Sequence, residues 1–234
     1  MSIQQAVVVT GGSNGLGLRL LCRLLKHGYH VFSIGQTYPV VPEKFARRIT
    51  HLACNLGVNG YSRAVTRWLD GYSDQFDFVG FIHSAGVGNT KPLLESSVES
   101  IVEQININLQ SSILLTKIVL PHLNRHQSRI FFIGSRSRRF PFLGGSAYCA
   151  SKAGLYALSD CLALEVRKLG WNIGITIFEF GTIATGFASV PVSDLQISPD
   201  GAARLMMRIF VTPLNDYDVR VVEAVPAVSR LSNG

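Results

Sequence analysis

The stretch AVVVTGGSNGLG, residues 6–17, decides the fold of this chain. It opens with a β-branched run, which predicts a buried strand, and then turns at a cluster of glycines. Leucines recur at helical spacing over residues 16–27, and Gly28 marks the expected end of that helix. Glycines between a strand and a helix let the backbone approach a phosphate, with the helix N–H groups facing the anion. This context indicates a dinucleotide site, although a tight structural turn would need the same glycines.

Outward from this turn, strand and helix patterns alternate along the whole chain. Several strands are apolar on both faces, as strands between two helix layers must be. The pattern predicts an α/β fold, a Rossmann-like doubly wound parallel sheet flanked by helices, in a single domain over residues 1–234. Strands are expected at 6–10, 30–34, 48–54, 76–86, 129–135, 172–181 and 218–225, and helices at 16–27, 62–69, 98–123, 147–168 and 199–210.

The composition predicts a compact globule in the cytoplasm. Apolar residues make up 47% of the chain and charged residues 16%, and no apolar stretch reaches the roughly 18 residues that cross a bilayer. The N-terminus lacks the basic start of a secretory signal, and the four cysteines form no metal-binding pair. The formal charge of +7 suits an anionic cofactor or substrate. Nucleic acid is not expected as a partner, because the basic residues lack an ordered aromatic stripe or a reading helix.

The pair Tyr148 and Lys152 stands four residues apart in the helix expected at 147–168, so both side chains share one face. A free phenol has a pKa of about 10. A neighbouring ammonium and the positive start of the helix are expected to lower the Tyr148 pKa toward neutrality. Such a phenol can exchange a proton with a carbonyl or an alcohol. The spacing also occurs by chance, but Ser135 ends a strand at the same expected edge of the sheet.

Together these motifs resemble those of the short-chain dehydrogenase/reductase family. The resemblance covers roughly residues 5–190, in order and at the usual spacing. No single motif is specific, but the complete ordered set is. The matching pieces are TGGSNGLG at 10–17, HSAG at 83–86, Asn108 in the long helix, Ser135 in FIGSRS, YCASK at 148–152 and FGTIAT at 180–185.

The resemblance implies an oxidoreductase that transfers a hydride between a nicotinamide cofactor and a small carbonyl compound or alcohol. Tyr148 would be the general acid/base, and Lys152 would lower its pKa and hold the nicotinamide ribose. Ser135 would polarise the substrate oxygen, and Asn108, with Asn106 as a nearby competitor, would order a water in the proton relay. The cofactor-binding residues implied are Gly11, Ser13, Asn14, Gly15, Leu16, Gly17, Gln36, Asn55, Leu56, Ser84, Ala85, Gly86, Tyr148, Lys152, Gly181, Ile183 and Thr185. No metal site is expected.

The sequence also departs from the family pattern. His83 and Ser84 replace two asparagines of the family, and Phe180 replaces a proline. His83 is expected to be structural or to pack near the adenosine. Asn55 stands where an aspartate often contacts adenine. The segment after Thr185 is short, which implies an open pocket or one completed by a neighbouring subunit.

The residues after the second strand bear on the choice between NADP and NAD. NAD-preferring relatives usually carry an acidic residue there, and here Gly35 and Gln36 follow the strand. No carboxylate repels a 2′-phosphate, but no arginine holds one, and Asn14 stands where NADP-preferring relatives often have a basic residue. The missing acid and the positive charge of the chain favour NADP, with NAD as the alternative.

The basic loop SRSRRFPFLGG at 135–145 has two interpretations. It is either a solvated charge run or a feature that attracts an anionic substrate through Arg136, Arg138 or Arg139. Such a substrate would be a carboxylate, a coenzyme A thioester or an acyl group bound to a carrier protein.

Two other functions stay open. A member of the family can epimerise or isomerise its substrate through transient oxidation, and a dinucleotide sensor can keep the fold without catalysis. The four residues matching the catalytic set argue against the sensor, because a pure binder has no chemical need of all four. Relatives commonly form dimers or tetramers through two long helices, so a homodimer or homotetramer is implied here through residues 98–123 and 152–168.

Overall fold

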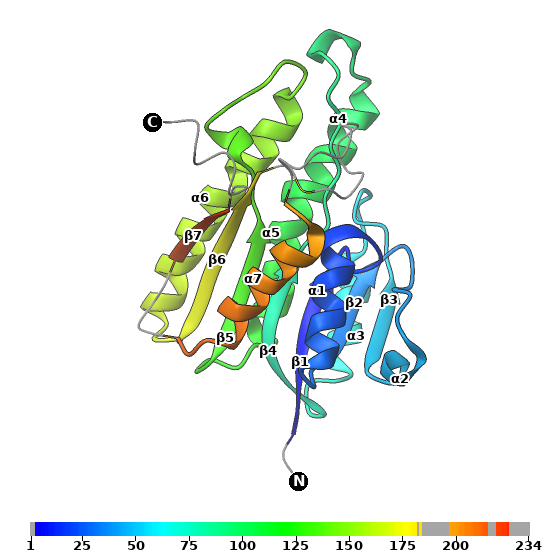
Figure 1. Cartoon of the computed structure of the whole chain (residues 1–234), viewed down its shortest axis with the longest axis vertical. Helices are drawn as coiled ribbons and strands as arrows, with labels where there is room; N and C mark the ends of the chain where they lie inside the picture. Colours follow the sequence, from blue (N-terminus) through cyan, green and yellow to red (C-terminus); the bar gives the residue numbers. More distant parts are fainter. Residues whose placement is uncertain (1–2, 182, 184–196, 215–218, 225–234) are drawn as a thin grey trace.

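The computed structural model describes residues 3–181, 183, 197–214 and 219–224, whose strands form one sheet (Figure 1). Every pairing in this sheet is parallel, and the strand order is β3-β2-β1-β4-β5-β6-β7. The doubly wound α/β fold expected from the sequence is thereby confirmed. The strands are β1 (Gln4–Thr10), β2 (His30–Gly35), β3 (Ile49–Ala53), β4 (Phe76–His83), β5 (Ser128–Ile133), β6 (Ile173–Phe180) and β7 (Val219–Ala224).

Helices cover both faces of the sheet (Figure 1). On one face α1 packs beside α7, and on the other face α3 contacts α5, and α4 contacts α6. Within the described residues, no helix is both long and apolar enough to cross a membrane. The helices are α1 (Gly15–Lys26), α2 (Glu43–Ala46), α3 (Ser62–Asp70), α4 (Val98–Ile105), α5 (Ser111–Val119), α6 (Ser146–Lys168) and α7 (Pro199–Val211).

The alternation of side chains along β1 builds a core on each face of the sheet. Val7 and Val9 belong to the apolar cluster beneath α1 and α7, whereas Ala6 and Val8 belong to the cluster on the opposite face. All four are fully buried. The strand is therefore apolar throughout, because each face of the sheet is covered by helices.

The helix α1 begins where the sequence predicts. The side chain of Asn14 caps it by accepting a hydrogen bond from the Gly15 N–H at 2.7 Å. Leu20 and Leu24 are fully buried on the face that packs against the sheet and α7. The helical period thus places one leucine stripe in the core and the N-terminus of α1 at the end of β1.

The strand order reverses at β1, within the sheet. β1 pairs with β2 on one side and with β4 on the other, and Thr10 is in register with His83. His83 is in turn in register with Phe132 near the end of β5. The segments that follow β1, β4 and β5 therefore emerge side by side at the carboxyl edge of the sheet, where open α/β sheets bind ligands.

The helix expected over residues 98–123 is less regular than the sequence indicates. Between α4 and α5 lies a five-residue π-helical turn, Asn106–Gln110, and a 3₁₀ turn, Leu120–His122, follows α5. Periodicity cannot distinguish these from a continuous helix, because a π turn shifts the spacing by a single residue. The turn contains Asn108, whose side-chain contacts are described below.

Candidate active site

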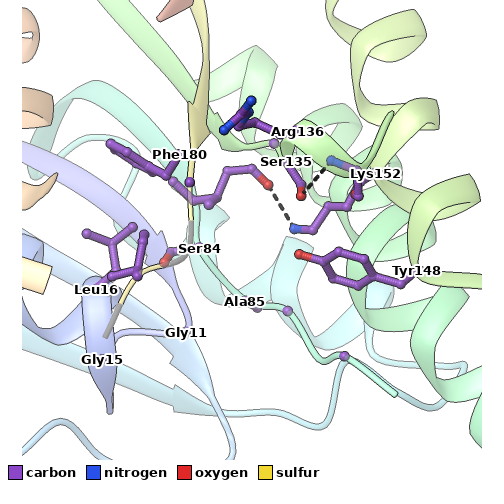
Figure 2. Close-up of a pocket in the computed structure, with 18 of the residues that line it drawn as sticks. Gly11, Gly15, Leu16, Ser84, Ala85, Ser135, Arg136, Tyr148, Lys152 and Phe180 are labelled. Carbon is purple, nitrogen blue, oxygen red and sulfur yellow. Dashed lines mark hydrogen bonds between the residues drawn. The ribbon is translucent and has the colours of Figure 1, made fainter. Parts of the chain in front are cut away.

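A cavity of about 790 Å³ lies at the carboxyl edge of the sheet (Figure 2). Its walls come from the turn after β1, the segment after β4, the loop between β5 and α6, and the end of β6. Figure 2 shows Gly11, Gly15 and Leu16 on one side, and Tyr148 and Lys152 on the other. The cavity therefore joins the glycine turn to the tyrosine–lysine pair.

The glycine turn is packed directly on the segment after β4. Gly11 has a φ of 67°, and a Cβ there would lie 2.7 Å from the Ala85 nitrogen. A Cβ on Gly17 would collide with the Gly11 carbonyl oxygen, and the Thr10 hydroxyl accepts a hydrogen bond from the Ala85 N–H at 3.1 Å. Only glycine allows this approach, which brings the free N–H groups of the first turn of α1 to the cavity. Such a cradle suits the phosphates of a dinucleotide.

Ser135 lies two residues past the end of β5 and caps the short 3₁₀ turn Arg136–Arg138. Its Oγ accepts a hydrogen bond from the Ser137 N–H at 3.1 Å. The hydroxyl proton stays available for a partner in the cavity, because this bond uses only a lone pair. The Ser135 side chain is thereby held by the turn that it starts.

Tyr148 and Lys152 project from the first turns of α6 toward the part of the cavity that Ser135 lines (Figure 2). The Lys152 Nζ donates a hydrogen bond to the Ile133 carbonyl oxygen at 2.8 Å and lies 5.7 Å from the centroid of the Tyr148 ring. Only 5% of Lys152 is exposed. The ammonium is thus fixed between the end of β5 and the phenol.

The electrostatics of this pair differ from the sequence-based expectation. Burial raises the pKa of Tyr148, and a hydrogen bond with the Ser135 side chain opposes that rise without cancelling it. Burial also lowers the pKa of Lys152 to about 8. The prediction that the chain by itself lowers the Tyr148 pKa toward neutrality is therefore wrong. Desolvation of the phenol outweighs the hydrogen bond with Ser135, which favours the phenolate.

Asn108 lies behind the cavity rather than in its wall. Its side-chain oxygen accepts from the Val87 N–H at 2.8 Å, and its amide group donates to the Val87 carbonyl at 2.9 Å and to Ser151 Oγ at 3.1 Å. The Asn108 carbonyl accepts from the Ser112 hydroxyl at 2.9 Å. Asn108 thus ties the segment after β4 to α6, and its role in a water relay stays a prediction. Asn106 donates instead to the Gly57 carbonyl, at 2.9 Å.

A sequence model described as short chain dehydrogenase matches residues 5–194, which is most of the chain. The chain belongs to the short-chain dehydrogenase family. This membership agrees with the resemblance inferred from the ordered motifs of the sequence.

Curated members of the family are distant in sequence. Benzil reductase of Bacillus cereus, the (S)-benzoin-forming enzyme, is 26% identical over 76% of this chain and 76% of its own length. The mitochondrial D-beta-hydroxybutyrate dehydrogenase of Rattus norvegicus is 28% identical over 73% of this chain, and 3-dehydrosphinganine reductase TSC10B of Arabidopsis thaliana is 31% identical over 77%. The matches span only 52% and 56% of these two longer relatives.

Solved structures share the fold over nearly the whole chain. Serine dehydrogenase from Escherichia coli gives a TM-score of 0.78 at 22% identity and covers 95% of this chain and 98% of its own. Alcohol dehydrogenase from the archaeon Thermococcus sibiricus, solved in complex with 5-hydroxy-NADP, gives 0.80 at 20% identity and covers 96% and 97%. At this level of identity the likeness establishes the architecture.

His83 and Phe180, two departures from the family pattern, have structural partners. His83 is buried, its Nε2 lies 2.8 Å from Ser111 Oγ, and its Nδ1 lies 3.3 Å from Ser112 Oγ. Burial and the charge of Lys152 lower the His83 pKa to about 3, so this residue stays neutral at physiological pH. The Phe180 ring stacks on Phe178 with ring centroids 5.6 Å apart and also lines the cavity.

The basic loop after Ser135 is clamped by a buried carboxylate. Glu179 on β6 has no exposed surface and accepts hydrogen bonds from Arg138 at 3.1 Å, Arg139 at 2.6 Å and the Tyr156 hydroxyl at 2.8 Å. Arg139 also pairs with Glu223. Burial opposes the Glu179 charge, but these donors outweigh it and lower the Glu179 pKa. Arg138 and Arg139 therefore stabilise the loop, and their attraction of an anionic substrate stays a prediction.

Most of the predicted cofactor-binding residues lie on the cavity, but three of the described ones do not. Gln36 is exposed after β2, the Asn55 side chain accepts from the Gly57 N–H at 2.9 Å, and Leu56 is buried in the core. Thr185 lies outside the described residues. The predicted residues that line the cavity are Gly11, Ser13, Asn14, Gly15, Leu16, Gly17, Ser84, Ala85, Gly86, Ser135, Tyr148, Lys152, Gly181 and Ile183.

The cavity also has walls that the sequence analysis did not assign to the site. One signal in the sequence was the FPF run at residues 140–142 in the loop that follows Ser135, since both of its rings line the cavity. The end of β5 contributes because Ser135 follows it by two residues. These additional lining residues are Gly88, Thr90, Ile133, Gly134, Ser137, Phe140, Phe142 and Phe180.

Proposed function

We propose that this protein is an NADP-dependent oxidoreductase that interconverts a small carbonyl compound and its alcohol. The observation that carries the proposal is that a glycine turn at the switch point of the sheet shares one cavity with Ser135, Tyr148 and Lys152. A binding protein would need only the turn. Ser135, Tyr148 and Lys152 add a hydroxyl, a proton donor and a buried cation to the same cavity.

The residues of the cavity fit a nicotinamide dinucleotide. The turn at Gly11 and Gly17 would hold its phosphates through backbone N–H groups, and Tyr148 and Lys152 would hold the nicotinamide ribose. When bound, the nicotinamide supplies or accepts the hydride, which no side chain of the protein can do.

The protein supplies the proton and the orientation of the substrate. The carbonyl oxygen would accept hydrogen bonds from Ser135 Oγ and Tyr148 Oη. Because burial raises the Tyr148 pKa, the phenol is protonated at neutral pH and gives its proton to this oxygen as negative charge develops there. Lys152, with a pKa of about 8, is largely an ammonium at that pH and stabilises the phenolate that remains. Alcohol oxidation needs the phenolate first, so oxidation should gain rate as the pH rises.

The preference for NADP over NAD rests on Gly35 at the end of β2. Among the described residues, no atom lies within 4 Å of a Cβ placed there, so the position has room for a side chain but offers no carboxylate to repel a 2′-phosphate. Among relatives of the same fold, serine dehydrogenase has been solved in complex with NADP+. Gly35→Asp should weaken NADPH binding at least about tenfold and spare NADH. Tighter binding of NADH than of NADPH by the wild type would refute the preference.

The function is tested with a panel of ketones, aldehydes and alcohols offered with each nucleotide, while the absorbance of the reduced nicotinamide is followed. Net oxidation or reduction supports the proposal. Conversion of a substrate without net change in nicotinamide would indicate epimerisation or isomerisation. Nucleotide binding without conversion of any compound would indicate a sensor.

We also propose a homo-oligomer in the cytoplasm. On α4, Val98 and Val102 are 69% and 48% exposed, and on α6 Leu164 is 65% exposed, which supports pairing through these two helices. The four cysteines are all free thiols, which supports a reducing compartment. Light scattering on the purified protein distinguishes a monomer from a dimer or tetramer.

A further inference from the structure

Arg136 differs from the other arginines of its loop. It follows Ser135 directly, is exposed and lines the cavity, and its guanidinium lies 5.2 Å from the centroid of the Phe140 ring. No described carboxylate pairs with it. Arg138 and Arg139, by contrast, are both paired with carboxylates, since they share Glu179 and Arg139 also contacts Glu223. One turn thus carries two arginines that hold the loop and one that lines the cavity without an ion-pair partner among the described residues.

The backbone that carries Arg136 is held in place. Ser135 caps the turn, and the ion pairs of Glu179 fix its later residues. The Tyr156 hydroxyl lies 3.5 Å from the Ser135 carbonyl oxygen and donates its stronger bond, at 2.8 Å, to Glu179. A ligand that binds the guanidinium therefore needs to order one side chain and not the whole loop, which lowers the entropic cost of binding.

The charges around the cavity favour an anion. Its described lining residues include two cations, Arg136 and Lys152, and no aspartate or glutamate. The Lys152 ammonium is buried and bound to the Ile133 carbonyl, so Arg136 is the cation with donors left for a ligand at the mouth. In a partly enclosed site, such an imbalance attracts a negatively charged substrate more strongly than it would in open water.

We infer that Arg136 binds the carboxylate of an oxo-acid or hydroxy-acid substrate, and this inference rests on the proposed function. The carbonyl or alcohol oxygen lies at Ser135 and Tyr148. Arg136 follows Ser135 directly and both residues line the same cavity, so we place the carboxylate on the side of the substrate that lies toward this turn. The planar guanidinium matches a carboxylate with two parallel hydrogen bonds. The rings of Phe140 and Phe142 give the same wall an apolar surface for the rest of the substrate.

The nucleotide does not account for this arginine. Its phosphates belong at the glycine turn, and Figure 2 shows Gly11 and Gly15 well apart from Arg136. The nicotinamide ring carries no negative charge that Arg136 would balance.

The test compares acids with their neutral esters in the presence of NADPH. The probes are acetoacetate and benzoylformate, each beside its methyl ester, and the variants are Arg136→Gln, Arg136→Lys and Lys168→Gln. Lys168 is an exposed residue in the last turn of α6 and controls for the loss of one positive charge. Arg136→Gln should lower kcat/KM for the acids about 10- to 100-fold, mainly through KM, and leave the esters within about threefold. Arg136→Lys should recover part of the loss. Lys168→Gln should leave kcat/KM unchanged for both the acids and the esters.

An equal loss for acids and esters, or no loss for the acids, would overturn the inference. If the wild type converts none of the four probes, the proposed function has failed for this substrate class and the inference is decided by binding. Calorimetry then measures benzoylformate on the wild-type complex with NADP+ and on the Arg136→Gln complex. Binding that Arg136→Gln weakens at least about tenfold supports the carboxylate subsite, and absent or unchanged binding refutes it.

Discussion

The two walls of the cavity are built on different principles. The wall at Gly11 and Gly17 is backbone packed on backbone, with no room for a Cβ. The wall from Ser135 to Gly145 is shaped by side chains, through the ion pairs of Glu179 and the rings of Phe140 and Phe142. The first wall offers backbone N–H groups, whose position does not depend on side chains, and suits a ligand common to a whole family. The second wall can change its charge and shape by substitution, which suits a ligand particular to one protein.

The largest effect is expected at Tyr148, which follows the side-chain wall on α6 and lines the same cavity. Tyr148→Phe removes the proton donor but keeps the ring, so kcat should fall about a thousandfold or more while the Kd for NADPH stays within about threefold. Stopped-flow reduction and fluorescence titration measure the two quantities. A matched control is Tyr156→Phe. It removes the hydroxyl that donates to Glu179, and Tyr156 is not among the residues that line the cavity. It should keep most of kcat and lower stability by about 1 kcal/mol.

If Tyr148→Phe lost nucleotide binding together with its rate, the two walls would not be separable in function. If it kept full activity, the assignment of Tyr148 as the proton donor would be wrong.

The second prediction addresses the backbone wall. Gly17→Ala places a Cβ against the Gly11 carbonyl oxygen, so the turn must shift at a cost of about 3 kcal/mol. NADPH affinity should fall at least about 100-fold, and to the same extent for every substrate tested. Gly28→Ala is the control, because Gly28 has a positive φ of 95° but no described atom within 4 Å of a Cβ. It should lose about 1 kcal/mol of stability and no affinity.

Nucleotide affinity in Gly17→Ala equal to that of the wild type would mean that the glycine turn does not hold the phosphates. Differential scanning fluorimetry of both variants distinguishes the expected loss of affinity from simple unfolding.

The same contrast explains what the sequence could predict. The glycines indicate the backbone geometry of the turn, and the Tyr148–Lys152 spacing indicates that both side chains share one face of a helix. Both features are encoded within a few residues of the chain. The role of the arginines was not predictable, because their partner Glu179 lies 40 and 41 residues away on β6. The rise in the Tyr148 pKa was missed for a similar reason, since burial depends on the whole fold. The π turn at Asn108 shifts the helical phase too little to be seen in the pattern.

The third prediction concerns Glu179, which holds the side-chain wall. Glu179→Gln leaves two arginines without their buried counter-charge and should lower the free energy of unfolding by about 2–3 kcal/mol. The lowered pKa of Glu179 means that its stabilisation is complete above the unfolded pKa, near 4.5, and is lost as the pH falls below it. Urea denaturation at pH 7 and pH 4 measures both effects. The difference between wild type and variant should shrink at the lower pH, and a difference that grows there would contradict the assignment.

The fourth and smallest effect is expected at His83, behind the backbone wall. Burial and the Lys152 charge lower the His83 pKa from 6.5 to about 3. Between these values the unfolded chain binds a proton that the folded chain does not, so stability falls as the pH falls, by about 1.4 kcal/mol per pH unit for this residue. His83→Asn keeps a hydrogen-bonding side chain beside Ser111 but does not titrate. Denaturant midpoints between pH 6.5 and pH 5 should therefore fall more steeply in the wild type than in the variant. Parallel slopes would show that His83 is not the buried neutral imidazole that its contacts with Ser111 and Ser112 indicate.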